Sequence, residues 1–362
     1  MMSAAYSSFR PGGKWTDTEG KPIFVHGGSV LPHDGWFYWY GENKEKTDGS
    51  NGIWNWGIRF YRSKDLYNWE DLGLVIPPDL DDASSPLHPA QFTDRPHIVQ
   101  NPATGKFVCW IKVMAGSRQT RSVLVADTIL GPYRLLARDM MPVGMSAGDF
   151  DVVTSADDGK GYMYFERVHS ELICADLDSE YTGFTGYYST HFPRPGPPSV
   201  REAPAYFYRR GRHYLATSGT TGYFPNPSEI AVADTFHGPW THLGDLHPTD
   251  TSRTSFNSQI SCIFKHPTKR DLYIAMADRW MGEIADPEFE SGRLSELVQA
   301  AYGKSFSQPR QVLEQDEERA FAIAGTLAVN TAASGHVWLP IDFSGAYPTI
   351  RWRDEWCIED FD

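Results

Sequence analysis

The chain has 362 residues, with 46 acidic and 33 basic side chains, so its formal net charge is −13 with histidine neutral. Nucleic acids and anionic membranes are bound by concentrated basic surfaces. No basic run occurs along this chain, so we expect neither of these partners. Hydrophobic residues make up 41% and aromatic residues 14% of the sequence, which supports a large packed core and excludes a disordered protein.

Targeting and redox features are few. Residues 1–11 contain no charged segment followed by an apolar one, and no apolar stretch is long enough to cross a bilayer. For the sequence as written we expect a cytoplasmic protein, and a secreted or periplasmic one if a leader has been removed. The four cysteines, Cys109, Cys174, Cys262 and Cys357, form no C-x-x-C pair and have no histidine at ligand spacing. We expect buried free thiols in strands, not a zinc site or disulfides.

A short motif repeats along the chain. The segment ADTILGPY at residues 126–133 recurs as ADTFHGPW at residues 233–240, with five identities and an aromatic exchange at the last position. Both copies follow a β-patterned run, and residues 61–69 form a looser relative in which a strand again leads into a polar turn and an aromatic. Self-similarity of this kind is typical of repeat architectures.

Hairpin patterns occur at regular intervals. Pairs of apolar runs around a turn lie at residues 29–40, 97–110, 152–165, 205–217 and 260–275. The spacing of roughly 50 to 70 residues, with further strand signal after each hairpin, favours four-stranded propeller blades over a sandwich. We therefore predict an all-β fold, a five-bladed β-propeller.

One segment departs from the strand pattern. Between about residues 286 and 333, the runs 295–301 and 311–322 carry helix-forming residues without strand alternation. Strand signal resumes at residues 336–340 and 349–358. We predict a single propeller domain over residues 1–362, with a helical insertion in its last blade. The Pro-rich residues 193–199 are expected to be a loop between blades.

A propeller gathers the first strands of its blades around an axis, so polar residues at their starts converge on one pocket. The five starts are residues 26–29, 93–96, 146–151, 201–204 and 255–259. Glu202, at such a start among aromatics, can have a raised pKa and donate a proton. The competing interpretation is an ion pair with Arg201.

The other polar starts also leave two interpretations open. Asp94 and Arg95 either form a structural pair, with Arg95 orienting a carboxylate, or Asp94 holds a substrate hydroxyl. Asp149 and Asp151 alternate along a strand and therefore share a face. His26, ahead of two glycines, permits close approach of a ligand, although a lone histidine more often only forms hydrogen bonds.

Aromatic residues supply candidate platforms for a sugar ring. Trp56 and Trp280 either stack on a ligand or fill the space between blades. The loop-borne Trp54, Tyr223 and Phe224 are the better candidates for a platform.

The ordered motifs resemble a known family. They are HGG from His26, DGWFYWYGE from Asp34, SKDLYNW from Ser63, Arg95-Pro96, DDGK from Asp157, EAP from Glu202, TSG from Thr217 and DRW from Asp278. In this order they resemble glycoside hydrolase family 43, and more narrowly its exo-β-1,3-galactanase (galactan 1,3-β-galactosidase) branch. The similarity extends from about His26 to Asp354, except for the helical segment.

The resemblance implies a five-bladed propeller and hydrolysis of a glycosidic bond with inversion. It implies that Glu202 is the general acid, that Gln259 takes the place of the base, and that Asp149 tunes Glu202 and positions the sugar. Most of the wider family has a first-blade aspartate base, whereas the galactanase branch has the HGG motif there. Gln259 can be a base only through an imidic-acid tautomer, and otherwise holds the water.

Together with the aromatic candidates, the resemblance gives the expected substrate-binding residues: His26, Asp94, Arg95, Trp54, Tyr223, Asp278 and Trp280. Two departures affect the substrate assignment. The family's second-blade glutamate is the shorter Asp94, and its third-blade Ser-Arg-Asp is Ala147-Gly148-Asp149, which lacks the arginine.

The expected substrate is an oligosaccharide or polysaccharide, namely β-1,3-galactan or arabinogalactan side chains. The alternatives are another family 43 glycosidase (β-galactofuranosidase, α-L-arabinofuranosidase or β-xylosidase) and a carbohydrate-binding propeller without catalysis. None of these requires a cofactor or a catalytic metal, and a structural cation in the axial channel is left open.

Overall fold

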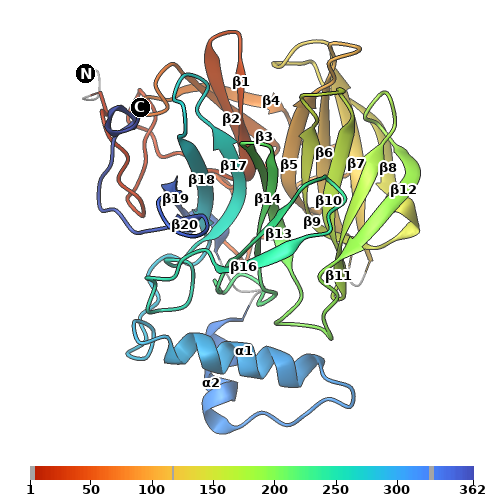
Figure 1. Ribbon diagram of the computed structural model, residues 1–362. Helices are drawn as coiled ribbons and strands as arrows, with labels where there is room; N and C mark the ends of the chain where they lie inside the picture. The colour runs from red at the N-terminus through yellow and green to blue at the C-terminus, as the bar shows by residue number, and fades with distance from the viewer. Residues whose placement is uncertain (1–4, 116–117, 326–329) are drawn as a thin grey trace.

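The computed structural model of the protein describes residues 5–115, 118–325 and 330–362. Within them the strands form five four-stranded antiparallel sheets arranged around an axis, which confirms the predicted five-bladed propeller (Figure 1). The first strands of neighbouring blades contact one another and therefore surround the axis.

The strands follow one another in chain order within every blade. The first blade contains β1 (Val25–His33), β2 (Trp36–Asn43), β3 (Ile58–Ser63) and β4 (Glu70–Ile76). The second contains β5 (Phe92–Gln100), β6 (Phe107–Ala115), β7 (Arg118–Ala126) and β8 (Arg134–Met140). The third contains β9 (Ala147–Thr154), β10 (Gly161–Arg167), β11 (Glu171–Leu177) and β12 (Phe184–His191). The fourth contains β13 (Glu202–Arg209), β14 (Arg212–Ser218), β15 (Glu229–Ala233) and β16 (Thr241–Asp245). The fifth contains β17 (Gln259–Lys265), β18 (Tyr273–Arg279), β19 (Gly335–Asp342) and β20 (Thr349–Ile350).

Burial follows the position of a strand in its blade. The inner strand β10 is buried at all positions except its last, whereas the outer strand β8 has no buried position. Inner strands are covered on both faces by neighbouring blades, so their sequences are almost continuously apolar, as for any sheet buried on both sides. The outer strands need only one apolar face.

The two chain ends lie close together and join the first and last blades (Figure 1). The backbone of Phe9 exchanges hydrogen bonds of 2.8 and 3.1 Å with Trp356. The two rings also stack, with centroids 4.3 Å apart. This contact packs the N-terminal segment against the C-terminal segment next to the propeller.

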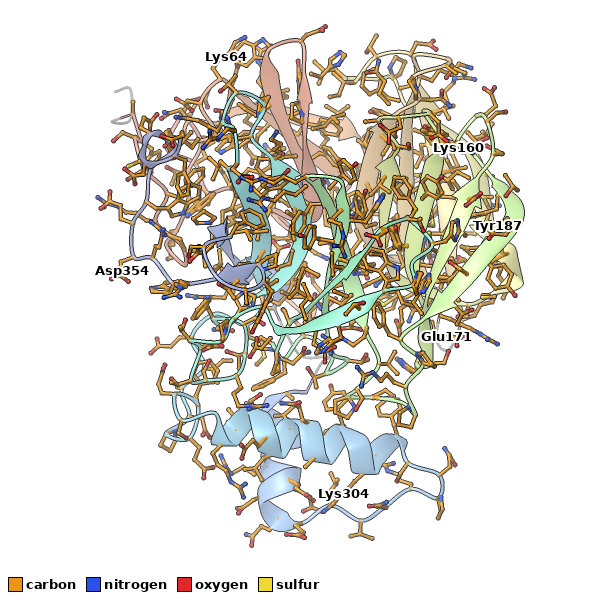
Figure 2. The ribbon with its side chains drawn as sticks, viewed as in Figure 1. Lys64, Lys160, Glu171, Tyr187, Lys304 and Asp354 are labelled. Carbon is orange, nitrogen blue, oxygen red and sulfur yellow. The ribbon has the colours of Figure 1, made fainter. Side chains whose placement is uncertain are left out.

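The predicted helical insertion is confirmed: α1 (Arg293–Phe306) and α2 (Gln315–Ile323) lie between β18 and β19 of the last blade. Because the strands are antiparallel, this connection lies at the end of the propeller where the first strand of each blade begins. We call this end the start face. Lys304 on α1 marks it in Figure 2, while Lys64 and Lys160 lie at the opposite end.

The cysteines agree with expectation at three positions. Cys109, Cys174 and Cys262 are free thiols buried in β6, β11 and β17. Cys357 is also free but is partly exposed and lies outside any strand, so that part of the expectation was wrong. The chain has left the blade there, and the Cys357 N–H donates to Asp360 at 3.2 Å in a surface turn. No helix in the described ranges is long and apolar enough to span a bilayer.

Candidate active site

Glu202 begins β13 at the start face, as expected for the first strand of the fourth blade. The competing ion pair with Arg201 is not formed: the Arg201 guanidinium pairs with Glu229 at 3.3 Å and donates to the Thr217 carbonyl at 2.7 Å. Burial, and then the negative charges of Asp149 and Glu166, raise the pKa of Glu202 well above its usual range. A carboxyl tuned in this way keeps its proton to higher pH than an ordinary glutamic acid and can donate it.

Asp149 has the opposite environment. Its Oδ2 pairs with Arg95 Nε at 2.9 Å and its Oδ1 with Lys112 Nζ at 2.6 Å. Burial would raise its pKa, but these two cations outweigh burial and hold the pKa of Asp149 well below its usual range. Arg95, from the second blade, thus supplies the arginine partner that the sequence lacks next to Asp149.

Asp151 shares a strand with Asp149 but has a different surrounding. Its Oδ2 accepts a hydrogen bond from the Tyr206 backbone N–H at 2.8 Å, and its Oδ1 lies 3.2 Å from His97 Nδ1. These contacts join the second, third and fourth blades. Asp151 therefore has a structural role.

Gln259 begins β17 and links the two carboxyl environments. Its Oε1 accepts hydrogen bonds from Arg95 Nη2 at 2.5 Å and Trp280 Nε1 at 3.2 Å. Its Nε2 donates to Glu202 Oε1 at 3.2 Å and Ser218 Oγ at 3.0 Å. The amide has thus used both its donors, and its oxygen already accepts two hydrogen bonds.

An aromatic wall lies over these groups. It consists of Trp54, Tyr223 and Trp280, with the Tyr223 ring centroid 5.9 Å from that of Trp54 and 5.5 Å from that of Trp280. Trp54 Nε1 donates to Asp94 Oδ1 at 2.7 Å, and the other Asp94 oxygen lies 3.3 Å from Lys112 Nζ. Each tryptophan of the wall therefore holds one polar residue of the site.

Two further aromatic candidates lie elsewhere. Phe224 is only 1% exposed and packs in a hydrophobic cluster with α1 and α2, so the expectation that it offers a ligand platform was wrong. Trp56 lies under the Lys46 ammonium, 4.0 Å from its ring centroid. Phe224 lies in a loop by sequence but is a core residue, because α1 and α2 cover it.

His26 and Asp278 form a buried pair behind the wall. His26 Nδ1 lies 2.9 Å from Asp278 Oδ1, and the Gly27 N–H donates to Asp278 Oδ2 at 2.9 Å. Burial lowers the pKa of His26 to about 4 despite this hydrogen bond. His26 is completely buried, so its side chain supports the site from behind.

His26 and Asp278 also belong to a group of three residues whose side chains are of the types that bind metal ions. His26, Asp278 and His336 each offer a ligand atom, and these atoms lie within 4.8 Å of one another in the described residues. Both Asp278 oxygens already accept hydrogen bonds from protein groups. His26 Nε2 and both ring nitrogens of His336 are buried without a hydrogen-bond partner in the described residues. The group therefore has the donor atoms both for a hydrogen-bonded support and for a structural cation.

Sequence analysis missed two charged residues of the site, Glu42 and Lys112. Glu42 Oε1 accepts from the Arg95 backbone N–H at 2.9 Å, and its Oε2 pairs with Lys44 Nζ at 2.8 Å. Burial raises the pKa of Glu42 to about 7, although Lys44 opposes the shift. The signal for Lys112 was an isolated lysine inside the apolar strand β6.

Glu42 also explains the HGG motif. Gly27 has a φ of +63°, and a Cβ there would overlap Glu42 Oε1; a Cβ on Gly28 would overlap the Tyr40 carbonyl. Only glycine fits where the second strand approaches so closely. Glu42 therefore fills the space next to the first-blade start and leaves no room for a side chain from that start.

A large cavity of about 1030 Å³ lies beside this cluster, between the N-terminal segment and the connection from β18 to β19. Its lining includes Trp15, Asn257, Arg279 and Trp352, but none of Asp149, Glu202 and Gln259. The polar cluster on the axis is therefore identified as the candidate active site by its charges and hydrogen bonds, and not by this cavity, which none of those three residues lines.

Residues 21–279 match the model of glycosyl hydrolases family 43, while none of the curated proteins compared with the chain matches it. A solved family 43 β-1,3-galactosidase is 26% identical, with a TM-score of 0.76, and the match covers 100% of this chain and 65% of that one. An exo-β-1,3-galactanase from Clostridium thermocellum is 25% identical, with a TM-score of 0.72 and coverage of 96% and 66%. An exo-β-1,3-galactanase from Phanerochaete chrysosporium, solved with galactose, shares the fold at 23% identity, a TM-score of 0.74 and coverage of 97% and 68%.

The chain thus spans 65%, 66% and 68% of the length of these three structures. The family match extends over all of the first four blades and into the fifth. On this match and on the five-bladed fold, the chain belongs to glycoside hydrolase family 43.

Proposed function

We propose that this family 43 glycosidase releases galactose, with inversion, from the ends of β-1,3-linked galactan and of arabinogalactan side chains. The proposal is supported by the similar structures, which are described as a β-1,3-galactosidase and as exo-β-1,3-galactanases. It is also supported by the glycines of the first-blade start, because the resemblance to the galactanase branch depends on that motif.

The observation that carries the proposed chemistry is the opposite tuning of Glu202 and Asp149. Within the described residues Glu202 forms no ion pair and its pKa is raised, whereas Asp149 pairs with two cations and stays ionised. Paired carboxyl groups driven apart in pKa are typical of acid and anion roles within one site. Glu202 is accordingly the acid, which protonates the oxygen of the leaving sugar as its bond to the anomeric carbon breaks.

The role of Gln259 depends on a rearrangement. Inverting glycosidases place the acid and the water-binding group about 6.5 to 9.5 Å apart, whereas Gln259 Nε2 lies 3.2 Å from Glu202 Oε1. A sugar bound on the axis must therefore break this contact before Gln259 can hold the attacking water. Arg95 and Trp280 both donate to Gln259 Oε1 and lower its basicity, so we assign it to positioning the water.

The remaining expected residues divide into two groups. Asp94, Arg95 and Asp149 bind or orient the ring hydroxyls of the sugar, and Trp54, Tyr223 and Trp280 pack against its apolar face. His26 and Asp278 are buried and support Gly27 and the fifth-blade start. No cofactor is part of the proposed reaction.

The test is to incubate the protein with β-1,3-galactobiose and longer β-1,3-galactan and to follow proton NMR from the first minutes. Release of α-galactose is expected, and β-galactose as the first product would contradict inversion. Release from a nitrophenyl arabinofuranoside, xyloside or galactofuranoside, but not from galactobiose, would move the assignment to that sugar. Binding of the oligosaccharides without any product would favour a non-catalytic propeller.

A further inference from the structure

The connection between β18 and β19 is far longer than its counterparts at the start face. It covers residues 280–334, whereas β2–β3 is joined by residues 44–57 and β14–β15 by residues 219–228. Its helices α1 and α2 pack together through an apolar cluster, which we call the helix cluster: Phe224, Phe289, Leu294, Leu297, Val298, Tyr302, Ala320 and Ala324. One member, Phe224, comes from the propeller.

Helix α1 lies across loops of the start face. Ser295 Oγ donates to the Arg253 carbonyl at 2.8 Å, near the loop that leads into the fifth blade. A Cβ on Gly303 would touch Pro198 at 3.6 Å, in the loop that leads to Glu202. At the helix end, Phe306 packs edge-on against His169 of the third blade, with centroids 5.3 Å apart. The helix therefore crosses the face from the fifth blade to the third, as its position in Figure 1 also shows.

The charge of the proposed acid also acts on this helix. Burial, and then the negative charge of Glu202, raise the pKa of Tyr302 on α1 to about 12. By contrast, Val312, in the turn between α1 and α2, is 86% exposed. The insertion thus has one face toward the site and one toward solvent.

A chain of contacts joins α1 to the sugar-binding groups. Phe224 is anchored in the helix cluster, and its neighbour Tyr223 lies between Trp54 and Trp280. Those two tryptophans hold Asp94 and Gln259 through their indole N–H groups. A shift of Phe224 would therefore be passed to the aromatic wall by direct packing.

We propose that α1 is a positioning element for the sugar pocket, which acts through Phe224 to fix Tyr223 in the aromatic wall. The insertion is then a covering of the site and not an appendage on the side of the propeller. Phe224 itself does not touch substrate. Its loss should weaken sugar binding more than bond cleavage, because Glu202 is held separately by β13 and Gln259. The kinetic part of this inference rests on the proposed function, whereas its structural part does not.

The test uses Phe224→Ala, the conservative Phe224→Leu, and Val312→Ala as a control in the same insertion. The proteins are labelled with 5-fluorotryptophan, and the ¹⁹F resonances of Trp54 and Trp280 are assigned by Trp54→Phe and Trp280→Phe. We expect Phe224→Ala to shift both resonances, to leave that of Trp110 between the second and third blades unchanged, and Phe224→Leu to restore the native positions. Leu297→Ala removes a side chain of α1 from the helix cluster and should produce the same shifts. It replaces Phe224→Ala in the test if that variant does not fold.

Kinetics on the substrate that the wild type hydrolyses supply the second measurement. We expect KM to rise about tenfold with kcat within about threefold for Phe224→Ala, a partial return for Phe224→Leu, and no change for Val312→Ala. Unmoved Trp54 and Trp280 resonances in a folded variant would overturn the proposal, as would a loss confined to kcat. The NMR measurement uses no substrate, so absence of galactobiose hydrolysis would contradict the proposed function while leaving this inference to be judged by the resonances.

Discussion

The two sides of the axial site differ in how their charges are compensated. On the side of the second and third blades, Asp94 and Asp149 share Lys112, and Arg95 also pairs with Asp149. On the side of the fourth blade, Glu202 contacts the neutral amide of Gln259, while the nearest basic residue in sequence, Arg201, pairs with Glu229 instead. The same kind of burial therefore produces an anion on one side and a neutral acid on the other.

This difference shows that residue type alone does not assign a role to a carboxyl group. Burial disfavours the charged form on both sides. Arg95 on β5 and Lys112 on β6 reverse that effect at Asp149. They also lower the pKa of Glu202, but burial and the negative charges of Asp149 and Glu166 outweigh them there. The roles of anion and acid therefore depend on which residues of neighbouring blades pair with each carboxyl group.

The largest effect is expected when the acid on the fourth-blade side, Glu202, is removed. Glu202→Gln should lower kcat on β-1,3-galactobiose by about 10²- to 10⁴-fold, the usual contribution of a general acid. On galactosyl fluoride, whose leaving group needs no proton, the loss should be much smaller. The matched control is Glu171→Gln, which removes a carboxylate at the start of β11 in the third blade (Figure 2), where it pairs with Arg167, and should leave both rates unchanged. Equal losses on the two substrates would show that Glu202 does not donate the proton.

The second prediction removes the negative charge of Asp149. Asp149→Asn leaves Arg95 and Lys112 buried with less compensation, so the free energy of unfolding should fall by about 3 to 5 kcal/mol. Loss of its negative charge also lowers the pKa of Glu202, because Asp149 helps to raise it. The acid then loses its proton at lower pH, and the alkaline limb of the kcat/KM profile should move to lower pH.

Urea unfolding and a pH series measure these two effects. The exposed turn residue Asp158 pairs with Lys160 at 3.2 Å, so Asp158→Asn should produce neither change. An alkaline limb that stays in place in a folded Asp149→Asn protein would show that Asp149 does not tune the acid.

Much of the fold follows from local sequence, because the strands of each blade follow one another in chain order and several hairpins turn at a glycine. The turns at Asp34-Gly35 and Asp158-Gly159 lie between β1 and β2 and between β9 and β10, as predicted. The strand starts follow from the same repeat, which is why Glu202 and Gln259 were found. The helical insertion was visible as a loss of strand alternation.

What could not be predicted depends on contacts between distant segments. Glu42 and Lys112 lie in second strands: Glu42 fits beside Gly27, which has no side chain, and Lys112 lies opposite Asp94 in the sheet and reaches Asp149 of the third blade. Phe224 lies in what reads as an exposed loop, and nothing local shows that a helix about 75 residues later covers it. The residue types were visible in the sequence, but their partners were not.

A third prediction asks whether burial also disfavours the charged form of a base, His26, even beside the carboxylate of Asp278. Burial lowers the pKa of His26 from 6.5 to about 4, so the folded protein takes up this proton later than the unfolded chain. A depressed pKa of this kind gives stability that is present above the unfolded pKa and is lost as the pH falls through the folded one. Between pH 6.5 and about 4 the free energy of unfolding should therefore fall by up to about 3 kcal/mol on account of His26. Urea unfolding across this range should show a smaller fall for His26→Asn, and parallel curves for the two proteins would assign the loss to other groups.

The smallest expected effect concerns the wall that connects the two sides. Trp54→Phe keeps an aromatic ring next to Tyr223 but removes the indole N–H that holds Asp94 at 2.7 Å. A hydrogen bond to a charged group contributes about 1.5 to 3 kcal/mol. Asp94 keeps its contact with Lys112, so only part of this is lost, and KM should rise by about five- to tenfold while kcat changes little. Trp56→Phe is the matched control, because that ring packs under Lys46 and is outside the wall. A change in kcat as large as the change in KM would mean that Asp94 acts on the transition state, and that the cation-paired side takes part in bond cleavage as well as in binding.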